Sequence, residues 1–200
     1  MRRFRIALIF LVTLLGGCSL IPPQQQHPLP TEDSWLAHQQ RQLALDNWNM
    51  SGKIGIRLPQ KNHNANIHWQ QLSGHYAIEL TGPFGQGGAK IEGNGNGIIV
   101  NVAGEEPVWA DSPEQLMDRT LGWQFPVREM LYWVRGIPAP GSPYNQTLVG
   151  NRLDNLSQKN WQIKYLRYSQ QNEYSLPEKL IISQNDLRIT IIAKQWQILP

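Results

Sequence analysis

Cysteine is nearly absent from this 200-residue chain, which contains only Cys18. A single cysteine excludes an internal disulfide framework and any metal site built mainly from thiolates. Charge is also scarce, at 16% of residues, with a formal balance of +3. Arg2, Arg3 and Arg5 precede every acidic residue, and the other 15 of the 18 basic residues balance the 15 acidic ones. The body of the chain therefore has no basic field that would attract nucleic acid.

Common signatures of catalysis and metal binding are missing as well. The sequence has no G-x-S-x-G elbow, no H-E-x-x-H motif and no Walker phosphate loop. Glu105 and Glu106 are adjacent, so on a strand they point to opposite faces and cannot act as an acid–base pair. His63, His68 and His75 have no evident acidic partner, which favours ordinary surface histidines. We therefore predict no enzyme activity, no metal ion and no cofactor.

The chain lacks a hydrophobic run long enough to span a bilayer as a helix. Ile6–Leu15 is apolar except for Thr13, but a spanning helix needs about 20 such residues. Because this short run follows the cationic residues 1–5, it is typical of the apolar centre of a secretory signal peptide.

Leu15-Gly16-Gly17-Cys18 resembles the cleavage site of a bacterial lipoprotein signal. In such signals the cysteine thiol receives a diacylglycerol, the chain is cut before it, and the new amine is acylated. The resemblance implies a signal peptide over residues 1–17 and lipidation of Cys18, with firm anchoring because each buried CH₂ contributes about 0.8 kcal/mol. Ser19 in place of Asp resembles the sorting rule for the outer membrane in enteric bacteria. An ordinary signal peptide that happens to contain Cys18 remains the alternative.

Residues 18–30 are expected to form a flexible tether. They contain Pro22, Pro23, Pro28 and Pro30 with glutamines between them, and they have no apolar periodicity. Such a segment reaches about 3 Å per residue where it is polyproline-like. No repeat and no break follow, so residues 31–200 are predicted to form one domain.

Alternation of apolar and polar residues predicts that this domain is mainly one antiparallel sheet. Segments rich in Gly, Pro and Asn separate the alternating runs and indicate hairpin turns. The expected strands cover residues 48–58, 66–70, 75–81, 89–92, 98–102, 108–109, 147–149, 161–168, 179–183, 187–193 and 196–199.

Helices are expected at three places beside the sheet. The first covers 31–47, is capped by its first residue, and packs on the body through Trp35 and Leu36. The second begins at Asp111, where Asp-Ser-Pro-Glu is a helix start, and runs to about residue 121. The third begins near Pro126, and its one apolar face consists of Val127, Met130, Leu131 and Val134.

The apolar faces of these strands exceed what the short helices can cover. A sheet this wide tends to curl, because its strands twist. Large side chains such as Trp69, Tyr76, Trp161 and Tyr165 can fill the curl. The alternative is an open half-barrel whose helices form a lid over an apolar hollow. The residue pattern alone favours neither.

One loop carries an aromatic residue that its neighbours cannot bury. Phe84 stands among glycines and a proline in Gly82–Gly88, between two expected strands. A large apolar side chain at such a tip is expected to be exposed and available to a lipid or an apolar ligand. A loop that folds back and packs Phe84 on the sheet edge is the alternative.

The chain from its signal to its C-terminus resembles the LolB family of outer-membrane lipoprotein receptors in the lipoprotein localisation (Lol) pathway. The resemblance lies in the order and spacing of three segments, none specific alone: 67–71 (IHWQQ), 76–85 (YAIELTGPFG) and 133–138 (WVRGIP). It implies an unclosed β-barrel with short helices as a lid over an apolar cavity. Candidate cavity residues are Trp69, Ile78, Leu80, Ile91, Val100, Met130, Leu131 and Val134.

The same resemblance implies function. Members of the family take mature lipoproteins from the soluble periplasmic carrier LolA and insert them into the outer membrane, without catalytic chemistry. Their protruding loop uses an apolar residue, usually Leu, and that position matches Phe84 here, flanked by Pro83 and Gly85. The expected ligands are the acyl chains of cargo lipoproteins and the inner leaflet of the outer membrane, and the expected state is a monomer.

Two other functions are compatible with the residues alone. A structural lipoprotein that serves as an assembly subunit predicts a filled core and no bound lipid. A lipid-anchored hydrolase predicts a polar cleft with a perturbed acid or base.

Overall fold

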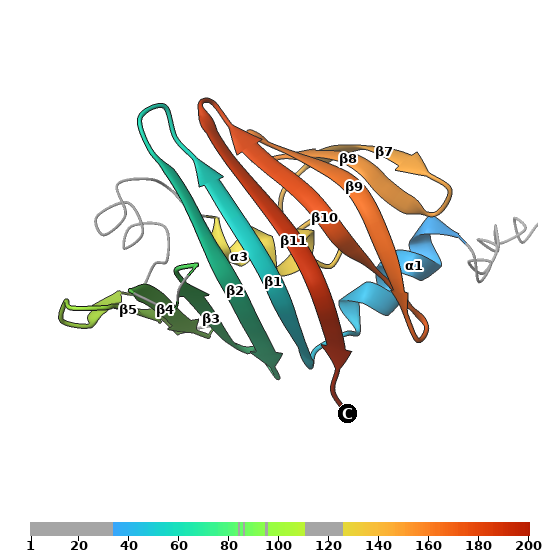
Figure 1. Cartoon of the computed structure of the whole chain (residues 1–200). Helices are drawn as coiled ribbons and strands as arrows, with labels where there is room; N and C mark the ends of the chain where they lie inside the picture. Colours follow the sequence, from blue (N-terminus) through green and yellow to red (C-terminus); the bar gives the residue numbers. More distant parts are fainter. Residues whose placement is uncertain (1–33, 84, 86, 95, 111–125) are drawn as a thin grey trace, which may run out of the picture.

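Eleven strands of the described chain form one antiparallel sheet. The computed structural model describes residues 34–83, 85, 87–94, 96–110 and 126–200. The strands are β1 Trp48–Arg57, β2 Asn62–Leu72, β3 His75–Thr81, β4 Gly88–Gly93, β5 Ile98–Val102, β6 Val108–Ala110, β7 Tyr144–Val149, β8 Arg152–Gln158, β9 Trp161–Gln171, β10 Tyr174–Gln184 and β11 Leu187–Ile198. Pairing of β1 with β11 joins two meanders, with the order β6-β5-β4-β3-β2-β1-β11-β10-β9-β8-β7 (Figure 1).

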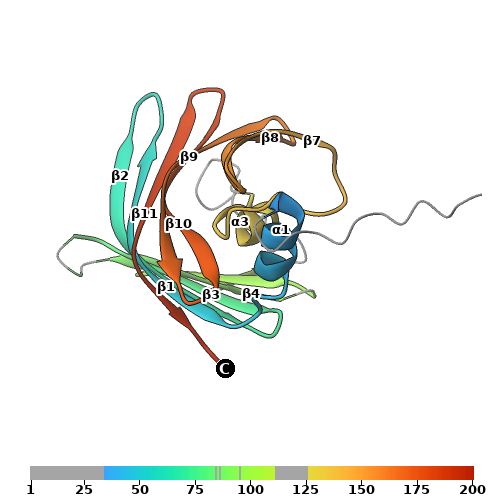
Figure 2. The same cartoon turned by 90° about the vertical axis from the view of Figure 1, so that its right-hand side faces the viewer.

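The sheet is curled but not closed. Strands β6 and β7 stand at opposite ends of its order, and no pairing joins them in the described residues. Figure 2 shows helices α1 (Trp35–Leu43) and α3 (Val127–Trp133) inside the curve, between the arm of β3 and β4 and the arm of β7 and β8. The predicted unclosed, mainly β fold with short covering helices is confirmed. No helix in the described ranges combines the length and apolar character that crossing a bilayer requires.

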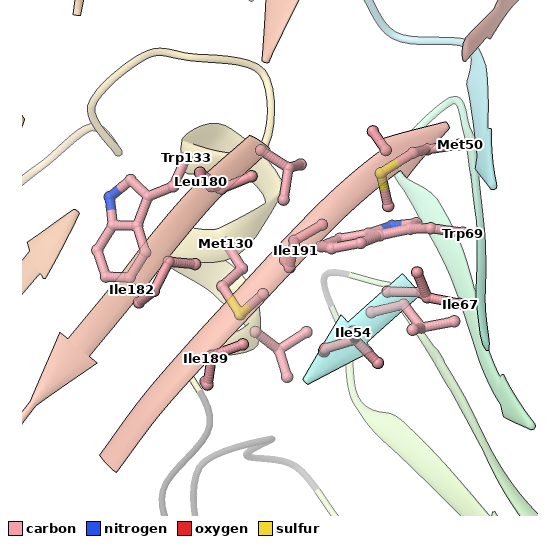
Figure 3. Close-up of a cluster of buried hydrophobic side chains, with 14 of the residues drawn as sticks. Met50, Ile54, Ile67, Trp69, Met130, Trp133, Leu180, Ile182, Ile189 and Ile191 are labelled. Carbon is pink, nitrogen blue, oxygen red and sulfur yellow. The ribbon is translucent and has the colours of Figure 1, made fainter. Parts of the chain in front are cut away.

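The strands alternate as the sequence predicts, and one face of the sheet is buried. On β1 the even-numbered residues Trp48, Met50, Ile54 and Ile56 are all at most 7% exposed. Side chains from β1, β2, β10, β11 and α3 meet in one cluster in the curve of the sheet (Figure 3). The buried face therefore continues through β1 and β11 from one meander to the other.

Strands β2, β7 and β10 begin three to five residues earlier than predicted, and two irregularities in pairing explain two further differences. Strand β8 was not expected, because its buried residues Leu153 and Leu156 are three apart rather than two. The register skips Asp154, so a bulge restores the inward direction of the next side chains. A second bulge, at Lys194, carries β11 through a segment predicted as two strands.

Helix α1 is shorter than predicted and buries different residues. It begins at Trp35, and the Ser34 Oγ caps it by accepting a hydrogen bond of 3.1 Å from the Ala37 backbone N–H. Trp35 packs against the core as expected, but Leu36 is 49% exposed, so its predicted packing is wrong. The helix buries polar side chains instead of a long apolar stripe, which sequence periodicity cannot foresee. Residue 31 and the predicted helix at 111–121 lie outside the described residues.

Strand β1 can approach β11 closely only because Gly52 has no side chain. A Cβ at Gly52 would lie 1.9 Å from the backbone oxygen of Ile192. The register also shifts at Gly52, beside the bulge of β11. The joint between the two meanders thus depends on a glycine.

Substituting alanine at two glycines of β1 tests this joint. We expect Gly52→Ala to lower the free energy of unfolding by about 1–3 kcal/mol, because backbone must shift to admit the methyl group. Gly55→Ala is the matched control, because its Cβ would meet only the flexible Asn64 side chain, at 3.2 Å. Urea unfolding of both variants measures the difference, and equal stabilities would contradict the account of the joint.

Candidate functional site

The predicted cavity residues of the sheet lie in one continuous row. Trp69 pairs with Ile78, Ile78 with Ile91, and Ile91 with Val100, so the row crosses β2 to β5 on the concave face. Each of the four is at most 1% exposed. Leu80 lies on the same face of β3, one inward position further along, and is partly buried.

Helix α3 covers the interior with the predicted face. Met130 and Val134 are fully buried, and Leu131 is partly buried against the same cluster. In Figure 3 the side chain of Met130 reaches from α3 toward β11, the strand that carries Ile189 and Ile191. The structure thus brings together all eight predicted cavity residues around one apolar interior.

Tryptophans occupy much of this interior. Trp48 lies between Trp69 and Trp196, with ring centroids 5.6 and 5.1 Å apart, and Trp133 packs near Trp161 at 6.2 Å. All five are at most 6% exposed. The described interior is therefore packed with side chains, so a ligand can enter only if some of them, or the covering helices, move.

The indole N–H groups differ in their partners. Trp133 Nε1 donates to Gln158 Oε1 at 2.9 Å, and Trp196 Nε1 donates to the Pro177 oxygen at 3.1 Å. The Nε1 atoms of Trp48 and Trp69 are buried with no acceptor in the described structure. A buried donor without a partner lowers the free energy of unfolding by about 1–3 kcal/mol, so two such donors in one core need an explanation.

Arg135 fixes the two helices to each other. Its Nη1 donates to the Gln42 and Leu45 oxygens, both at 2.9 Å, and its Nε donates to the Leu131 oxygen at 2.9 Å. These bonds join the end of α3 to the end of α1. The guanidinium is only 7% exposed, and its burial lowers its pKa from the usual value.

Gln158 holds the chain after α3 against β8. Its Oε1 also accepts from the Ala139 N–H at 2.9 Å, and its Nε2 donates to the Ala139 oxygen and to Ser142 Oγ. The Tyr165 hydroxyl donates to the Trp133 oxygen at 3.0 Å. Sequence reasoning missed Gln158, because a glutamine in a strand carries no pattern that predicts a buried role.

The segment Trp133–Pro138 is buried throughout. The hydrogen bonds of Arg135 and Gln158 described above hold it in place. Gly136 has a φ of +78°, and a Cβ there would lie 3.1 Å from the Tyr168 ring and 3.2 Å from Pro177. Glycine is therefore needed where α3 ends, both for its backbone conformation and for the close packing. Its neighbours Trp133 and Arg135 make the polar attachments, so this short segment joins α3 to both α1 and the sheet.

The buried side of α1 carries an unusual histidine. His38 is 2% exposed, and its Nε2 has no hydrogen-bond partner in the described residues. Burial, with a smaller effect from the positive charges of Arg41 and Arg152, lowers the pKa of His38 from 6.5 to about 4. The imidazole is thus neutral at physiological pH, as its environment requires.

A cleft opens beside the edge of α3. It has a volume of about 430 Å³ and lies between α3, the turn after α1 and the hairpin of β2 and β3. Its lining includes Leu45, Tyr76, Leu131, Tyr132 and Arg135. Because Arg135 and Leu131 belong both to this cleft and to the helix attachments, movement of α3 would join the cleft to the interior.

The loop between β3 and β4 extends into solvent at its described positions. Pro83 and Gly85 are exposed, and the Gly85 N–H donates to the Gly82 oxygen at 2.9 Å, which closes a tight turn. Apart from the chain neighbours, no atom of the described residues lies within 4 Å of a Cβ built at Gly85 or Gly87. Phe84 and Cys18 lie outside the described residues.

Comparison with known proteins identifies the family. The sequence model named "Outer membrane lipoprotein LolB" matches residues 46–196. The chain belongs to the LolB family. A curated outer-membrane lipoprotein LolB of Pseudomonas putida strain GB-1 is 41% identical over 191 residues, covering 94% of this chain and 92% of its own length. Its counterpart in Pseudomonas aeruginosa strain LESB58 is 40% identical over 188 residues, covering 93% and 92%.

Solved structures show the same fold at low identity. A LolA superfamily protein from Nitrosomonas europaea has a TM-score of 0.54 at 10% identity, covering 86% of this chain and 94% of its own. A putative outer membrane lipoprotein-sorting protein domain from Vibrio parahaemolyticus has a TM-score of 0.50 at 8% identity, covering 81% and 91%. These two similarities show a shared architecture, and the LolB family membership rests on the sequence matches.

Acid should weaken this LolB-family domain through His38. Between pH 6.5 and about 4 the unfolded chain binds more protons at this residue than the folded chain, so the free energy of unfolding falls as pH decreases through that window. We expect a loss of about 1–2 kcal/mol from this residue after solvent screening. Urea unfolding of the wild type and of His38→Gln above and below this window measures it. An equal loss in both proteins would show that His38 is not the cause.

Proposed function

We propose that this protein is the outer-membrane receptor that accepts mature lipoproteins from a periplasmic carrier of the LolA type and inserts them into the membrane. The observation that carries the proposal is an apolar interior in an unclosed sheet, covered in the described residues by two short helices, in a chain of the LolB family. Relatives that share about 40% of its sequence are named outer-membrane lipoproteins. The role needs no catalytic group, so we propose a non-enzymatic receptor that works as a monomer.

In the proposed binding step, cargo acyl chains replace contacts between apolar side chains of the interior. Cargo acyl chains enter past Leu131, where the cleft beside α3 meets the helix attachments. They replace contacts that Met130 and the tryptophans otherwise make with each other. Because apolar surface is covered before and after, the net free energy is small, and transfer runs toward the site with the higher affinity.

The attachments of the helices suit this exchange. Arg135 joins α3 to α1 through hydrogen bonds to backbone oxygens, which water can replace when the helices separate. A helix held only by apolar packing would expose its apolar side on opening, and water would form no hydrogen bonds there in return. Opening therefore requires the loss of a few polar contacts between the helices rather than unfolding of the sheet.

The unpaired indoles of Trp48 and Trp69 support a polar contact inside the apolar site. Their rings lie 5.6 Å apart, and both Nε1 atoms are buried without an acceptor among the described residues. Cargo lipids carry ester and amide carbonyls next to their acyl chains, and these oxygens accept hydrogen bonds. We propose that one or both indoles donate to such a carbonyl in the loaded receptor. This contact would explain why both buried N–H groups lack an acceptor in the described residues.

Delivery is assigned to the loop between β3 and β4. Pro83 and Gly85 project into solvent, and this supports a tip that reaches the bilayer. The apolar residue between them is Phe84, and Cys18 is proposed to hold the receptor at the membrane through its lipid. Uptake and delivery thus depend on different parts of the chain.

A two-step transfer assay tests the proposed function. The purified receptor is mixed with carrier that holds a radiolabelled lipoprotein, and then with liposomes. We expect the label to move to the receptor and then to the liposomes without ATP. No movement to the receptor, together with no lipid in its organic extract, would favour a structural assembly lipoprotein instead.

Phe84→Glu should separate the two steps. We expect uptake from the carrier to continue and delivery to liposomes to fail, because a carboxylate resists entry into the acyl region. The melting temperature should stay nearly unchanged, since exposed substitutions usually cost within about 0.5 kcal/mol. Phe84→Leu is the matched control and should deliver normally. A destabilised Phe84→Glu protein, or a stable one that still delivers, would contradict the insertion role.

Trp69→Phe should reduce cargo retention more than it reduces stability. It removes an indole N–H that has no partner in the described part of the chain, whereas Trp133→Phe removes one that donates to Gln158. Both rings are fully buried, so both variants lose similar volume. We expect Trp133→Phe to be less stable by about 1 kcal/mol, and Trp69→Phe alone to release cargo faster. Equal release rates from the two variants would rule out the proposed carbonyl contact.

A further inference from the structure

A hollow on the outer face of the sheet is surrounded by basic and amide side chains. Strands β2, β1 and β11 run side by side, with the helices behind them in the view of Figure 1. Their register places three outward residues of each strand in a block that we call the Gly55 block: Asn66, Asn64 and Asn62 on β2; Lys53, Gly55 and Arg57 on β1; Ile192, Thr190 and Arg188 on β11. All nine line a cleft of about 630 Å³.

Gly55 creates the hollow at the centre of this block. It lies directly between Asn64 and Thr190 in the register, and it contributes no side chain. A Cβ built there would meet only Asn64 Oδ1, at 3.2 Å. Unlike Gly52, this glycine is therefore not required by packing, and a side chain could be accommodated by a small movement of Asn64.

The cations of the Gly55 block have no countercharge among the described residues. Arg57 and Arg188 are directly opposite each other, which is unfavourable for like charges on neighbouring strands. No Asp or Glu lines the cleft, and among the described residues Lys53, Arg57 and Arg188 form no ion pair. Asp186, two residues before Arg188, makes none with it either. By contrast, Lys90 on β4 bridges both Glu79 and Glu92.

We infer that the Gly55 block binds the phosphate groups of membrane lipids. Arginine and lysine are the side chains that proteins use most for phosphate, and the asparagine amides and the Thr190 hydroxyl supply further donors. An oxyanion seated over Gly55 would lie beside the Arg57–Arg188 pair, two residues along β1, and would reduce the repulsion between the two cations. The block would hold headgroups, whereas the apolar interior on the other face of the sheet would hold acyl chains.

The position of the block relative to the β3–β4 loop favours a membrane over other anions. Pro83 lines the same cleft as Arg57 and Arg188, so contact with headgroups there would bring the loop to the bilayer surface. Each basic residue near an anionic surface contributes about 1 kcal/mol, which is about fivefold in the ratio of docked to undocked receptor. This inference rests on the proposed membrane receptor, because a tethered body is what the block would orient.

A label beside the block can measure docking in the full lipidated chain. Cys18 is the chain's only cysteine and its sulfur is proposed to carry lipid, so Gln60→Cys adds one reactive thiol, in the turn between β1 and β2. A fluorophore there is quenched by nitroxide headgroups in phosphatidylethanolamine vesicles with or without phosphatidylglycerol. We expect Arg188→Gln to reduce docking about fivefold, and added salt to reduce it in the wild type.

Two matched variants separate a built site from a diffuse charge effect. Lys164→Gln removes one cation from the exposed side of β9, outside the block, and should dock normally. Gly55→Thr fills the hollow with the charge unchanged and should reduce docking as Arg188→Gln does. Equal losses in Lys164→Gln and Arg188→Gln, or normal docking of Gly55→Thr, would overturn the inference.

Uptake of labelled lipoprotein from the carrier is measured on the same variants. Normal uptake with reduced docking supports a headgroup site. Normal docking with lost uptake would mean that the block receives an acidic surface of the carrier, and the inference would be wrong. Failure of uptake in the wild type would contradict the proposed function itself, so the two failures are distinguishable.

Discussion

A wide sheet that is apolar on one face has to keep that face away from water, and this constraint organises the molecule. Eleven strands supply the buried face, and two short helices supply the cover in the described chain. Curling brings the sheet's own side chains together, so Trp69 and Trp48 meet Met130 from α3 in one interior. The sheet is not closed in the described chain, and α1 and α3 lie between its two arms (Figure 2).

The need to cover the apolar face also explains how the interior can bind a ligand and release it again. The cover is attached through polar side chains, with Arg135 at α1 and Gln158 at β8, whereas the space beneath it is apolar. When the helices move, water can replace these buried polar attachments, and acyl chains can replace the apolar contacts. A receptor of this kind needs no chemical energy, since direction comes from differences in affinity.

Alternation along the strands made much of the fold and of the interior predictable. The sequence predicts one row of apolar residues on a single face, and the structure has it: Trp69, Ile78, Ile91 and Val100. This follows because alternate side chains of a strand point to the same face. Strand β8 was missed, because the bulge at Asp154 breaks that period. The roles of Arg135 and Gln158 were also unforeseen. Arg135 bonds to backbone oxygens near the end of α1, and Gln158 bonds to atoms of Trp133, Ala139 and Ser142. Contacts between such distant residues are specified only by the folded chain.

Photo-crosslinking from the two faces of β5 tests the central claim most directly. Val100 points into the interior and is 1% exposed, whereas its neighbour Ile99 lies on the opposite face and is more exposed. A diazirine amino acid is placed at one position or the other, and the receptor is loaded with lipoprotein whose acyl chains are radiolabelled. The account predicts labelled receptor from position 100 and none from position 99. Labelling only from position 99, or from neither position in a receptor that has taken up cargo, would contradict an acyl-binding interior.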